Sequence, residues 1–349
     1  MSKSIGILTY HNADNFGAVL QAYALQTVLM KKFNVDAQII NYHCDAVERT
    51  RYVYKNGKGL KALIRKCLLS IYYANKRSNF NKFRLKNLRL SPVYDSRNIK
   101  QCAYKYDAFI VGSDQVWNLE CSGWDYTFFL KFVVSKKKFS YAASIGTYIY
   151  TNSEQQKIAD YLIAFDGVSV REQSGAIRLQ EIGIKDIWVH PDPVFLLTSN
   201  YWKKIMSKRL CSCNYLFIYL VQQDVNVRRE AKQYAKMHNL KIIDNKKNIY
   251  FMYRNSPADF LSWIFYADCV FTNSFHGTAF SLVFNKPLAA DIELANGKIN
   301  NRIRDVLETL HAEKCILKEN LQQVYRPNAA TIVEQLCVKA FEYLSRICN

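Results

Sequence analysis

The stretch Asp268-Cys-Val-Phe-Thr-Asn-Ser-Phe-His-Gly-Thr-Ala-Phe-Ser-Leu-Val-Phe-Asn-Lys-Pro287 contains the clearest signals for the fold. Its apolar start, 269–271, predicts a short buried strand. The polar residues 272–277 predict a turn, and 278–284 predict a short helix that ends before Pro287. A strand, a turn and a helix in this order form the repeating unit of a parallel α/β sheet.

The turn in this stretch has the chemistry of an anion site. The N–H groups and the dipole at a helix start favour a negative charge, and Ser274 and Thr278 add hydroxyl groups. Gly277 lets a ligand approach the backbone closely, and His276 can exchange a proton near neutral pH. The alternative is an ordinary strand-to-helix turn with a capping serine and a structural histidine.

Length and composition limit the class of protein. The length of 349 residues suggests about two domains. Half of the residues are hydrophobic, so cores of normal size can form. The ten cysteines show no C-x-x-C pair and no zinc spacing, so we expect reduced thiols in a cytoplasmic protein and no metal. The chain enters its first predicted strand directly and has no apolar run of about 18 residues, so we expect neither a signal peptide nor a membrane-spanning helix.

The net charge of +19 is concentrated in one segment. Residues 49–94 contain 13 Lys and Arg and no Asp or Glu, and residues 58–73 have the pattern of a basic amphipathic helix. Three interpretations remain open: a helical insertion packed on its own domain with its charges in solvent, a surface that rests on an anionic membrane, and a nucleic-acid site. No nucleic-acid-binding motif accompanies the charge, so we expect no nucleic-acid partner.

The N-terminal 42 residues predict a strand, a helix and a second strand, which open a doubly wound parallel sheet. Ligands bind beyond the carboxyl ends of strands in such sheets. The turn 11–17 is therefore a candidate wall of the site, with Asn15 and Gly17 at the helix start. The turn lacks the G-x-G-x-x-G pattern, so a dinucleotide is not indicated. A capped turn without a ligand is the alternative.

Two later strand ends also carry polar groups. The strand predicted at 107–111 leads into Asp114, and the strand predicted at 167–170 leads into Arg171. A guanidinium in this position can hold a phosphate or a carboxylate through two hydrogen bonds. The alternative is an ion pair between Arg171 and Glu172 or another neighbour.

The alternation of strands and helices predicts three parts. An N-terminal α/β domain occupies 1–197 and includes the basic helical insertion 49–94. A C-terminal α/β domain occupies 198–327. The final helix, 328–349, is expected to pack back toward the domain junction.

Six short motifs follow one another along the chain: Asn15-Phe-Gly-Ala-Val-Leu-Gln21, Gly112-Ser-Asp-Gln-Val-Trp-Asn118, Ser144-Ile-Gly146, Ser169-Val-Arg-Glu172, His190-Pro-Asp-Pro193 and Ser274-Phe-His-Gly277. In this order and spacing, the chain resembles the polysaccharide pyruvyl transferase family from about residue 5 to residue 310. The turn at 112–114, where other members can be richer in glycine, and the basic segment 49–94 depart from the family pattern. Because of these two departures, the resemblance does not identify the acceptor sugar.

The resemblance implies a fold and an activity. The fold would be two doubly wound domains that face each other, similar to the GT-B glycosyltransferases. The activity would be transfer of a pyruvyl group from phosphoenolpyruvate to a pair of sugar hydroxyls, as a ketal, in the synthesis of a surface polysaccharide such as capsule or exopolysaccharide. The enzyme would be cytoplasmic, with a soluble or lipid-linked glycan acceptor, and the basic segment would bring it as a peripheral protein to an anionic membrane surface.

The expected donor, phosphoenolpyruvate, is a substrate, so no cofactor is expected. Its phosphate and carboxylate need cations and helix N-termini. We expect His276 to contact the phosphate or to act as a general acid, with Ser274, Gly277 and Thr278 in the same nest. Arg171 is expected to clamp the phosphate or the carboxylate.

The remaining predicted site residues serve the acceptor or assist. Asn15, Gly17 and Asp114 are expected on the acceptor side, with Asp114 as the candidate base. Arg302 or Lys286 is expected to assist with the anion.

Two other classes of function stay open. A glycosyltransferase that uses a nucleotide sugar would share the architecture, although the second predicted domain shows no convincing acidic pair for a ribose. A non-enzymatic basic module that binds membranes or nucleic acid would explain the charge but leaves the polar strand ends unexplained.

Overall fold

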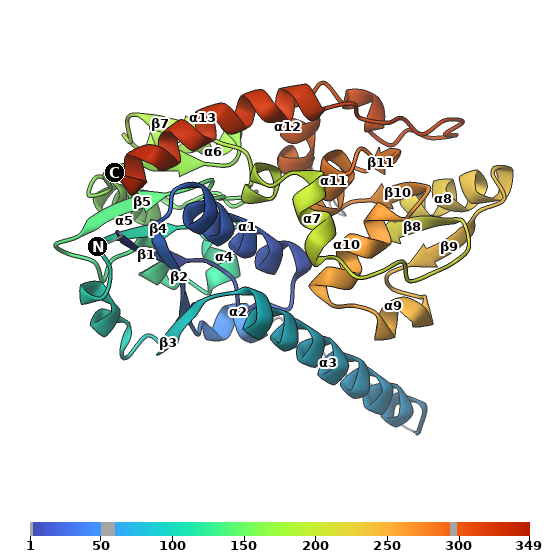
Figure 1. Ribbon diagram of the computed structural model, residues 1–349, viewed down its shortest axis with the longest axis horizontal. Coiled ribbons are helices and arrows are strands. Elements are labelled where there is room, and N and C mark those ends of the chain that lie inside the picture. Colours follow the sequence, from blue (N-terminus) through green and yellow to red (C-terminus); the bar gives the residue numbers. More distant parts are fainter. Residues whose placement is uncertain (1–2, 50–59, 294–298) are drawn as a thin grey trace. The chain divides into compact units, whose positions relative to one another are not determined.

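The computed structural model describes residues 3–49, 60–293 and 299–349. The chain divides into two compact units (Figure 1). Unit 1 comprises Met1–Asn56, Arg84–Leu197 and Gln335–Asn349, and unit 2 comprises Gly57–Phe83 and Thr198–Glu334. Each unit contains its own parallel sheet.

Unit 1 is built on a sheet with the order β3-β2-β1-β4-β5, and parallel bridges from β5 and the residues after it extend the sheet to the pair β6-β7. Every strand pair in it is parallel. The strands are β1 (Ser4–Leu8), β2 (Asp36–Tyr42), β3 (Leu90–Tyr94), β4 (Ala108–Val111), β5 (Lys137–Ser140), β6 (Val168–Val170) and β7 (Ile187–Val189).

The connections of unit 1 are mostly helical, as a parallel sheet requires. They are α1 (Phe16–Lys32), α2 (Asp45–Arg49), η1 (Ile99–Tyr104), α4 (Leu119–Ser122), η2 (Tyr126–Phe129), α5 (Asn152–Leu162), α6 (Gln173–Glu181) and η3 (Pro193–Leu196). Helix α1 is buried on all sides from Phe16 to Leu29, which explains its almost continuous apolar sequence. The core also holds Trp117, whose indole stacks on Phe129 at 5.7 Å between ring centroids.

Unit 2 contains a four-stranded parallel sheet in the order β11-β10-β8-β9. The chain forms β8, moves to one side for β9 and then to the other side for β10, so the switch point of the topology lies between β8 and β10. The elements are α7 (Ser199–Ile205), β8 (Tyr215–Tyr219), α8 (Val225–Met237), β9 (Lys241–Asp244), α9 (Ile249–Tyr253), α10 (Pro257–Phe265), β10 (Cys269–Thr272), α11 (Phe275–Val283), β11 (Leu288–Ala290), α12 (Asn301–Thr309) and η4 (Glu313–Cys315).

The predicted fold class is confirmed: the chain is α/β, with two doubly wound parallel sheets of the kind expected for a GT-B-like protein. The chain passes from unit 1 to unit 2 between Leu197 and Thr198. The basic segment differs from its prediction. Residues 57–83 group with unit 2, and residues 90–94 form β3, which pairs with β2 inside the first sheet.

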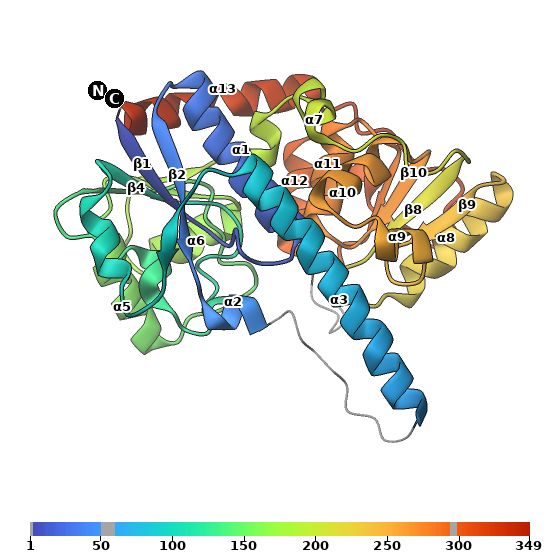
Figure 2. The ribbon, with the colours of Figure 1, turned by 60° about the horizontal axis from the view of Figure 1, so that its bottom comes forward.

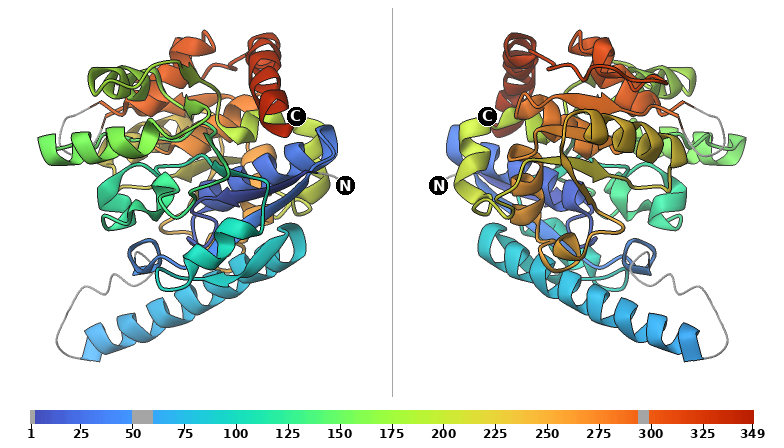
Figure 3. Two further views of the ribbon diagram at one scale, coloured as in Figure 1. Left: turned by 90° about the vertical axis from the view of Figure 1, so that its left-hand side faces the viewer. Right: turned by 90° about the vertical axis from the view of Figure 1, so that its right-hand side faces the viewer.

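The basic segment forms one long helix that continues beyond the predicted stretch 58–73. Helix α3 (Leu60–Asn87) runs without interruption, as Figure 3 shows. Residues 74–87 include no glycine or proline, so nothing in the sequence breaks the helix after residue 73. None of the helices in the described part of the chain combines the length and apolar composition needed to cross a bilayer.

The final helix, α13 (Ala330–Cys348), packs on unit 1 through most of its length. The Tyr343 hydroxyl donates a hydrogen bond to the Ser140 carbonyl at 2.9 Å, and the Lys3 ammonium donates to the Ile347 carbonyl at 2.8 Å. These contacts attach the C-terminal helix to the first sheet.

Candidate active site

The predicted anion nest lies at the start of α11, directly after β10. Ser274 caps the helix, and its hydroxyl accepts a hydrogen bond from the Gly277 N–H at 3.3 Å. Because of this cap, the helix begins at Phe275 and not at Thr278 as the sequence predicted. His276 therefore lies in the first turn of a helix, where backbone N–H groups have no carbonyl of the same helix to bond.

Gly277 is required by packing inside the unit. A Cβ atom at this position would lie 2.5 Å from the Thr272 hydroxyl oxygen and 3.0 Å from Cδ1 of Tyr219. The Thr272 hydroxyl is itself fixed, since it donates to the Tyr219 carbonyl and accepts from the Ser274 N–H. The glycine lets α11 begin close to the ends of β8 and β10.

His276 and Thr278 are both buried at this helix start. His276 is 9% exposed, and its imidazole ring packs edge-on against the Phe275 ring with 5.1 Å between ring centroids. Thr278 is fully buried, and its hydroxyl has no hydrogen-bond partner within the described part of the chain. The imidazole is thus held by packing at the positive end of the helix dipole, where a phosphate is favoured.

Two further cations predicted to assist also belong to unit 2. Arg302 is half-buried in the first turn of α12, a helix that packs against α11. Lys286 follows α11, and burial lowers the pKa of its ammonium group.

The structure adds a carboxylate pair that the sequence did not predict. Asp224 caps α8 after β8, and Asp291 follows β11. The amide of Asn273, directly after β10, donates to Asp224 at 3.4 Å. Burial and a hydrogen bond with Asp224 raise the pKa of Asp291 to about 7. The three residues follow three different strands and lie at the carboxyl edge that includes the switch point of the second sheet. A search of strand ends for acidic residues could have found each of the two residues, but not that they lie together.

The Asp291→Asn substitution should change how stability depends on pH. Folded Asp291 binds a proton that the unfolded chain has released, so its ionisation lowers the stability of the native state as pH rises from about 4 to about 7. The variant lacks this ionisation. We therefore expect its melting temperature, compared with that of the unchanged protein at the same pH, to be raised by about 2–4 °C more at pH 8 than at pH 5. Scanning calorimetry at both pH values measures this, with the exposed Glu334→Gln as control. A difference that is the same at both pH values would contradict the assignment.

In unit 1, Asn15 and Gly17 occupy the start of α1. The Asn15 side chain caps the helix by accepting from the N–H groups of Gly17 and Ala18 at 2.9 and 3.3 Å. Asn15 therefore caps the helix, as in the alternative of a capped turn that the sequence left open. Beside it, burial lowers the pKa of His11 to about 4, which keeps this histidine neutral.

Asp114 lies just beyond β4 in a left-handed backbone conformation, with φ of 77°. Its carboxylate accepts from the N–H of Gln115 at 2.8 Å and is half-buried. Its backbone forms a parallel bridge with Ala143, so the turn is part of the sheet edge. A non-glycine residue with this conformation marks a site that the surrounding structure constrains.

Arg171 is buried in an ion-pair network. Its Nη1 atom lies 2.8 Å from Oδ2 of Asp192, and its Nε atom lies 3.5 Å from Oε2 of Glu172. Burial alone would lower the pKa of Arg171, but the charges of Asp192, Glu172 and Asp114 outweigh it and raise the pKa. The ion pair that the sequence allowed as the alternative to a phosphate clamp is present.

This network joins four of the sequence motifs at the carboxyl edge of the first sheet. Asp192 also accepts from the Ser113 hydroxyl at 2.8 Å, and Glu172 accepts from the Ser144 hydroxyl at 2.7 Å and from two following N–H groups. The motifs at 112–118, 144–146, 169–172 and 190–193 are therefore neighbours in space. Sequence analysis identified the motifs but did not predict that Glu172 and Asp192 hold them together.

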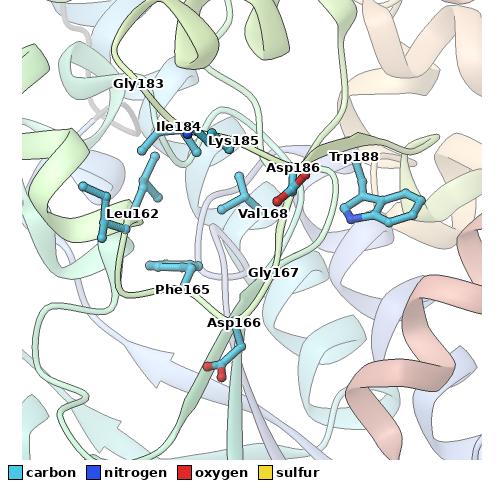
Figure 4. Close-up of a pocket in the computed structure, with 11 residues that line it drawn as sticks. Leu162, Phe165, Asp166, Gly167, Val168, Gly183, Ile184, Lys185, Asp186 and Trp188 are labelled. Atoms are coloured by element: carbon cyan, nitrogen blue, oxygen red, sulfur yellow. The ribbon is translucent and has the colours of Figure 1, made fainter.

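The pocket drawn in Figure 4 lies elsewhere in unit 1. It has a volume of about 350 Å³ and is lined by residues that precede or begin β6 and β7, among them Phe165, Asp166, Lys185 and Trp188. It thus lies toward the amino ends of these strands, and none of the predicted site residues lines it. Among the described residues, no group of three or more His, Cys, Asp and Glu side chains is arranged to hold a metal ion.

Comparisons with solved structures give similarities at low sequence identity. A UDP-GlcNAc 2-epimerase from Methanocaldococcus jannaschii is 13% identical, with 98% of this chain and 100% of that chain covered and a TM-score of 0.42. A UDP-N-acetylglucosamine 2-epimerase from Rickettsia bellii is 12% identical, with coverage of 100% and 98% and a TM-score of 0.44. An E. coli heptosyltransferase solved with ADP is 11% identical, with coverage of 97% and 99% and a TM-score of 0.41.

Comparison with family models gives a direct match. No curated protein sequence matches the chain. The model described as polysaccharide pyruvyl transferase matches residues 15–290, from the cap of α1 to the end of β11. The match therefore includes all six motifs, the whole second sheet and every strand of the first sheet except β1. The chain belongs to the polysaccharide pyruvyl transferase family.

Proposed function

We propose that the protein transfers the pyruvyl group of phosphoenolpyruvate to two hydroxyls of a sugar in a surface-polysaccharide precursor, forming a cyclic ketal. The observation that carries this proposal is the family match over residues 15–290. The buried imidazole at the start of α11 supports it, because a helix start with a histidine suits a small phosphorylated anion.

The proposed reaction balances without a redox step. A proton adds to the methylene carbon of phosphoenolpyruvate, which becomes a methyl group, and carbon 2 becomes electron-poor. One sugar oxygen bonds to carbon 2 and its hydroxyl proton leaves. The bond from carbon 2 to the phosphate oxygen breaks, and phosphate departs with the bonding electrons. The second sugar oxygen then bonds to carbon 2 and releases its proton, so that two protons are released and one is consumed, and the phosphate or the solvent takes the other.

The candidate residues have separate proposed roles in this reaction. His276 contacts the departing phosphate or supplies the proton to the methylene carbon, and Ser274 and Arg302 complete the anion site in unit 2. A positioned acid contributes about 10²- to 10⁴-fold to the rate. Gly277 and Thr278 shape the same helix start.

The carboxyl edge of the first sheet supplies the proposed acceptor residues. Asp114 is the candidate base for a sugar hydroxyl, and Asn15 and Gly17 line the turn at the start of α1. Arg171 holds Asp192 and Glu172 in the structure, and a direct contact with the donor is its second proposed role. The acceptor is proposed to be a glycan precursor, lipid-linked and met at an anionic membrane surface.

A nucleotide-sugar glycosyltransferase is the second candidate function, favoured by one specific observation. The pair Asp224 and Asp291 lies at the carboxyl edge of the second sheet. Carboxylates in such a position can accept hydrogen bonds from the hydroxyls of a ribose. The sequence argument against this function depended on the absence of an acidic pair, and the structure removes that argument.

One set of measurements separates the two candidates. We expect phosphoenolpyruvate to raise the melting temperature of the purified protein, and UDP-sugars and ADP-sugars to leave it unchanged. We also expect phosphate release only when phosphoenolpyruvate and a glycan acceptor are both present. Stabilisation by a nucleotide sugar, with no phosphate release from phosphoenolpyruvate, would support the glycosyltransferase.

A further inference from the structure

Two basic segments that are far apart in sequence meet on unit 2. The Asn75 side chain of α3 donates to the carbonyls of Met252 and Tyr253 at 3.3 and 3.4 Å, and the Asn79 side chain donates to Asn255 at 2.9 Å. Figure 2 shows α3 beside α9, which these bonds join. The inner face of α3 is also anchored by Phe80, which is fully buried.

Both segments carry cations without acids. Residues 67–83 of α3, in unit 2, contain Lys76, Arg77 and Lys82 and no Asp or Glu, and residues 246–254, Lys-Lys-Asn-Ile-Tyr-Phe-Met-Tyr-Arg, contain three cations and no acid. Lys82 on α3 and Lys246 and Lys247 before α9 are exposed. The fold thus brings together two parts of the chain that repel cations and attract anions.

The same surface exposes large apolar side chains. Ile71 is 60% exposed and lies one turn before Asn75, on the stripe of α3 that meets α9. On α9, Ile249, Tyr250 and Tyr253 are 61%, 57% and 61% exposed. The Lys241 ammonium lies 5.5 Å from the centroid of the Tyr250 ring, so cations and aromatic rings are interleaved.

We propose that this α3–α9 surface, defined by Ile71, Lys82, Lys246, Lys247, Ile249, Tyr250 and Tyr253, binds the protein to an anionic lipid bilayer. Lysines near a bilayer are attracted to acidic headgroups, and tyrosines favour the headgroup level, where the ring is apolar and the hydroxyl is wet. Exposed isoleucines gain from contact with acyl chains and gain little from a phosphate backbone. The combination fits a bilayer better than a nucleic acid.

The proposal deepens the membrane-side location proposed above and rests on it. It names the surface that would bring the enzyme to a lipid-linked acceptor. Binding to vesicles is measured here without donor or acceptor, so a failure of membrane binding is distinguishable from a failure of pyruvyl transfer.

The test is co-sedimentation of the full-length protein with vesicles. We expect binding to vesicles of phosphatidylcholine with about one-third phosphatidylglycerol, weakening as salt rises. We expect little binding to phosphatidylcholine alone. The variant Lys82→Glu/Lys246→Glu/Lys247→Glu should bind the anionic vesicles at least about 100-fold more weakly, since each lysine near a charged surface contributes about fivefold.

Two further variants make the outcome specific. The matched control Lys100→Glu/Lys131→Glu/Lys185→Glu changes the net charge equally at exposed positions of unit 1 and should retain most of the binding. The variant Tyr250→Ser/Tyr253→Ser should weaken binding while leaving its salt dependence in place. Equal loss in the two lysine variants, or equal binding to both kinds of vesicle, would overturn the proposal. Binding to duplex DNA without binding to anionic vesicles would overturn it in favour of nucleic acid.

Discussion

The His276→Ala substitution is expected to lower the turnover of pyruvyl transfer by about 10²- to 10⁴-fold. The imidazole is packed into the first turn of α11, where we propose that it either protonates the methylene carbon of the donor or holds the departing phosphate. Removing it leaves the helix dipole and the N–H groups in place, so some affinity for the donor should remain. Phosphate release with saturating acceptor measures the effect.

Two companion variants show which role the imidazole has. His276→Gln keeps the size and a hydrogen-bond donor but cannot transfer a proton near neutral pH. If His276 is the acid, Gln should be as inactive as Ala, whereas a phosphate contact alone should leave Gln with most of its turnover and a raised KM. His311→Asn, at an exposed left-handed position of unit 2 that tolerates asparagine, is the matched control. Full activity in His276→Ala would remove the residue from the site.

The Arg171→Met substitution is expected to destabilise the protein by about 3–5 kcal/mol, because it leaves the carboxylates of Asp192 and Glu172 buried without their cation. Denaturant unfolding, followed by a signal from unit 1, measures this. The exposed pair Arg97–Asp95 provides the control, and Arg97→Met should change the unfolding midpoint little.

A double variant tests whether the destabilisation comes from the buried charges. In Arg171→Met/Asp192→Asn, a neutral amide also replaces the Asp192 carboxylate that pairs with Arg171. The double variant should therefore lose less stability than the sum of the losses in the two single variants. If Arg171→Met unfolds at the same denaturant concentration as the unchanged protein and only raises KM for phosphoenolpyruvate, Arg171 is primarily a donor clamp. The ion-pair account would then be wrong.

The fold class could be predicted from sequence because its signals are local. A buried apolar run, a turn and a helix repeat along the chain, and each repeat can be recognised from its own residues alone. The start of α11 was predicted three residues too late, because the polar residues 272–277 were expected to form a turn, whereas the Ser274 cap places residues 275–277 inside the helix. Strand β3 was missed because the basic residues around it obscured its short apolar pattern.

The site could be predicted only in part, because its contacts join distant residues. The motifs that contain Asp114, Arg171 and His276 were identified from sequence, and their roles remain predictions. The structure shows which side chains interact: Asp192 and Glu172 pair with the Arg171 guanidinium, and Asp291 lies beside Asp224. No local pattern reveals that Asp224 and Asp291, 67 residues apart, follow strands of the same sheet.

The most direct test of the proposed chemistry uses phosphoenolpyruvate labelled with ¹³C at carbon 2. The purified protein is incubated with this donor and a glycan acceptor, and the product glycan is isolated and examined by NMR and mass spectrometry. The account predicts that the label becomes a quaternary carbon bonded to two sugar oxygens, with one phosphate released for each label transferred. A glycan that gains no label, while a sugar is transferred to it from a nucleotide donor, would contradict the account.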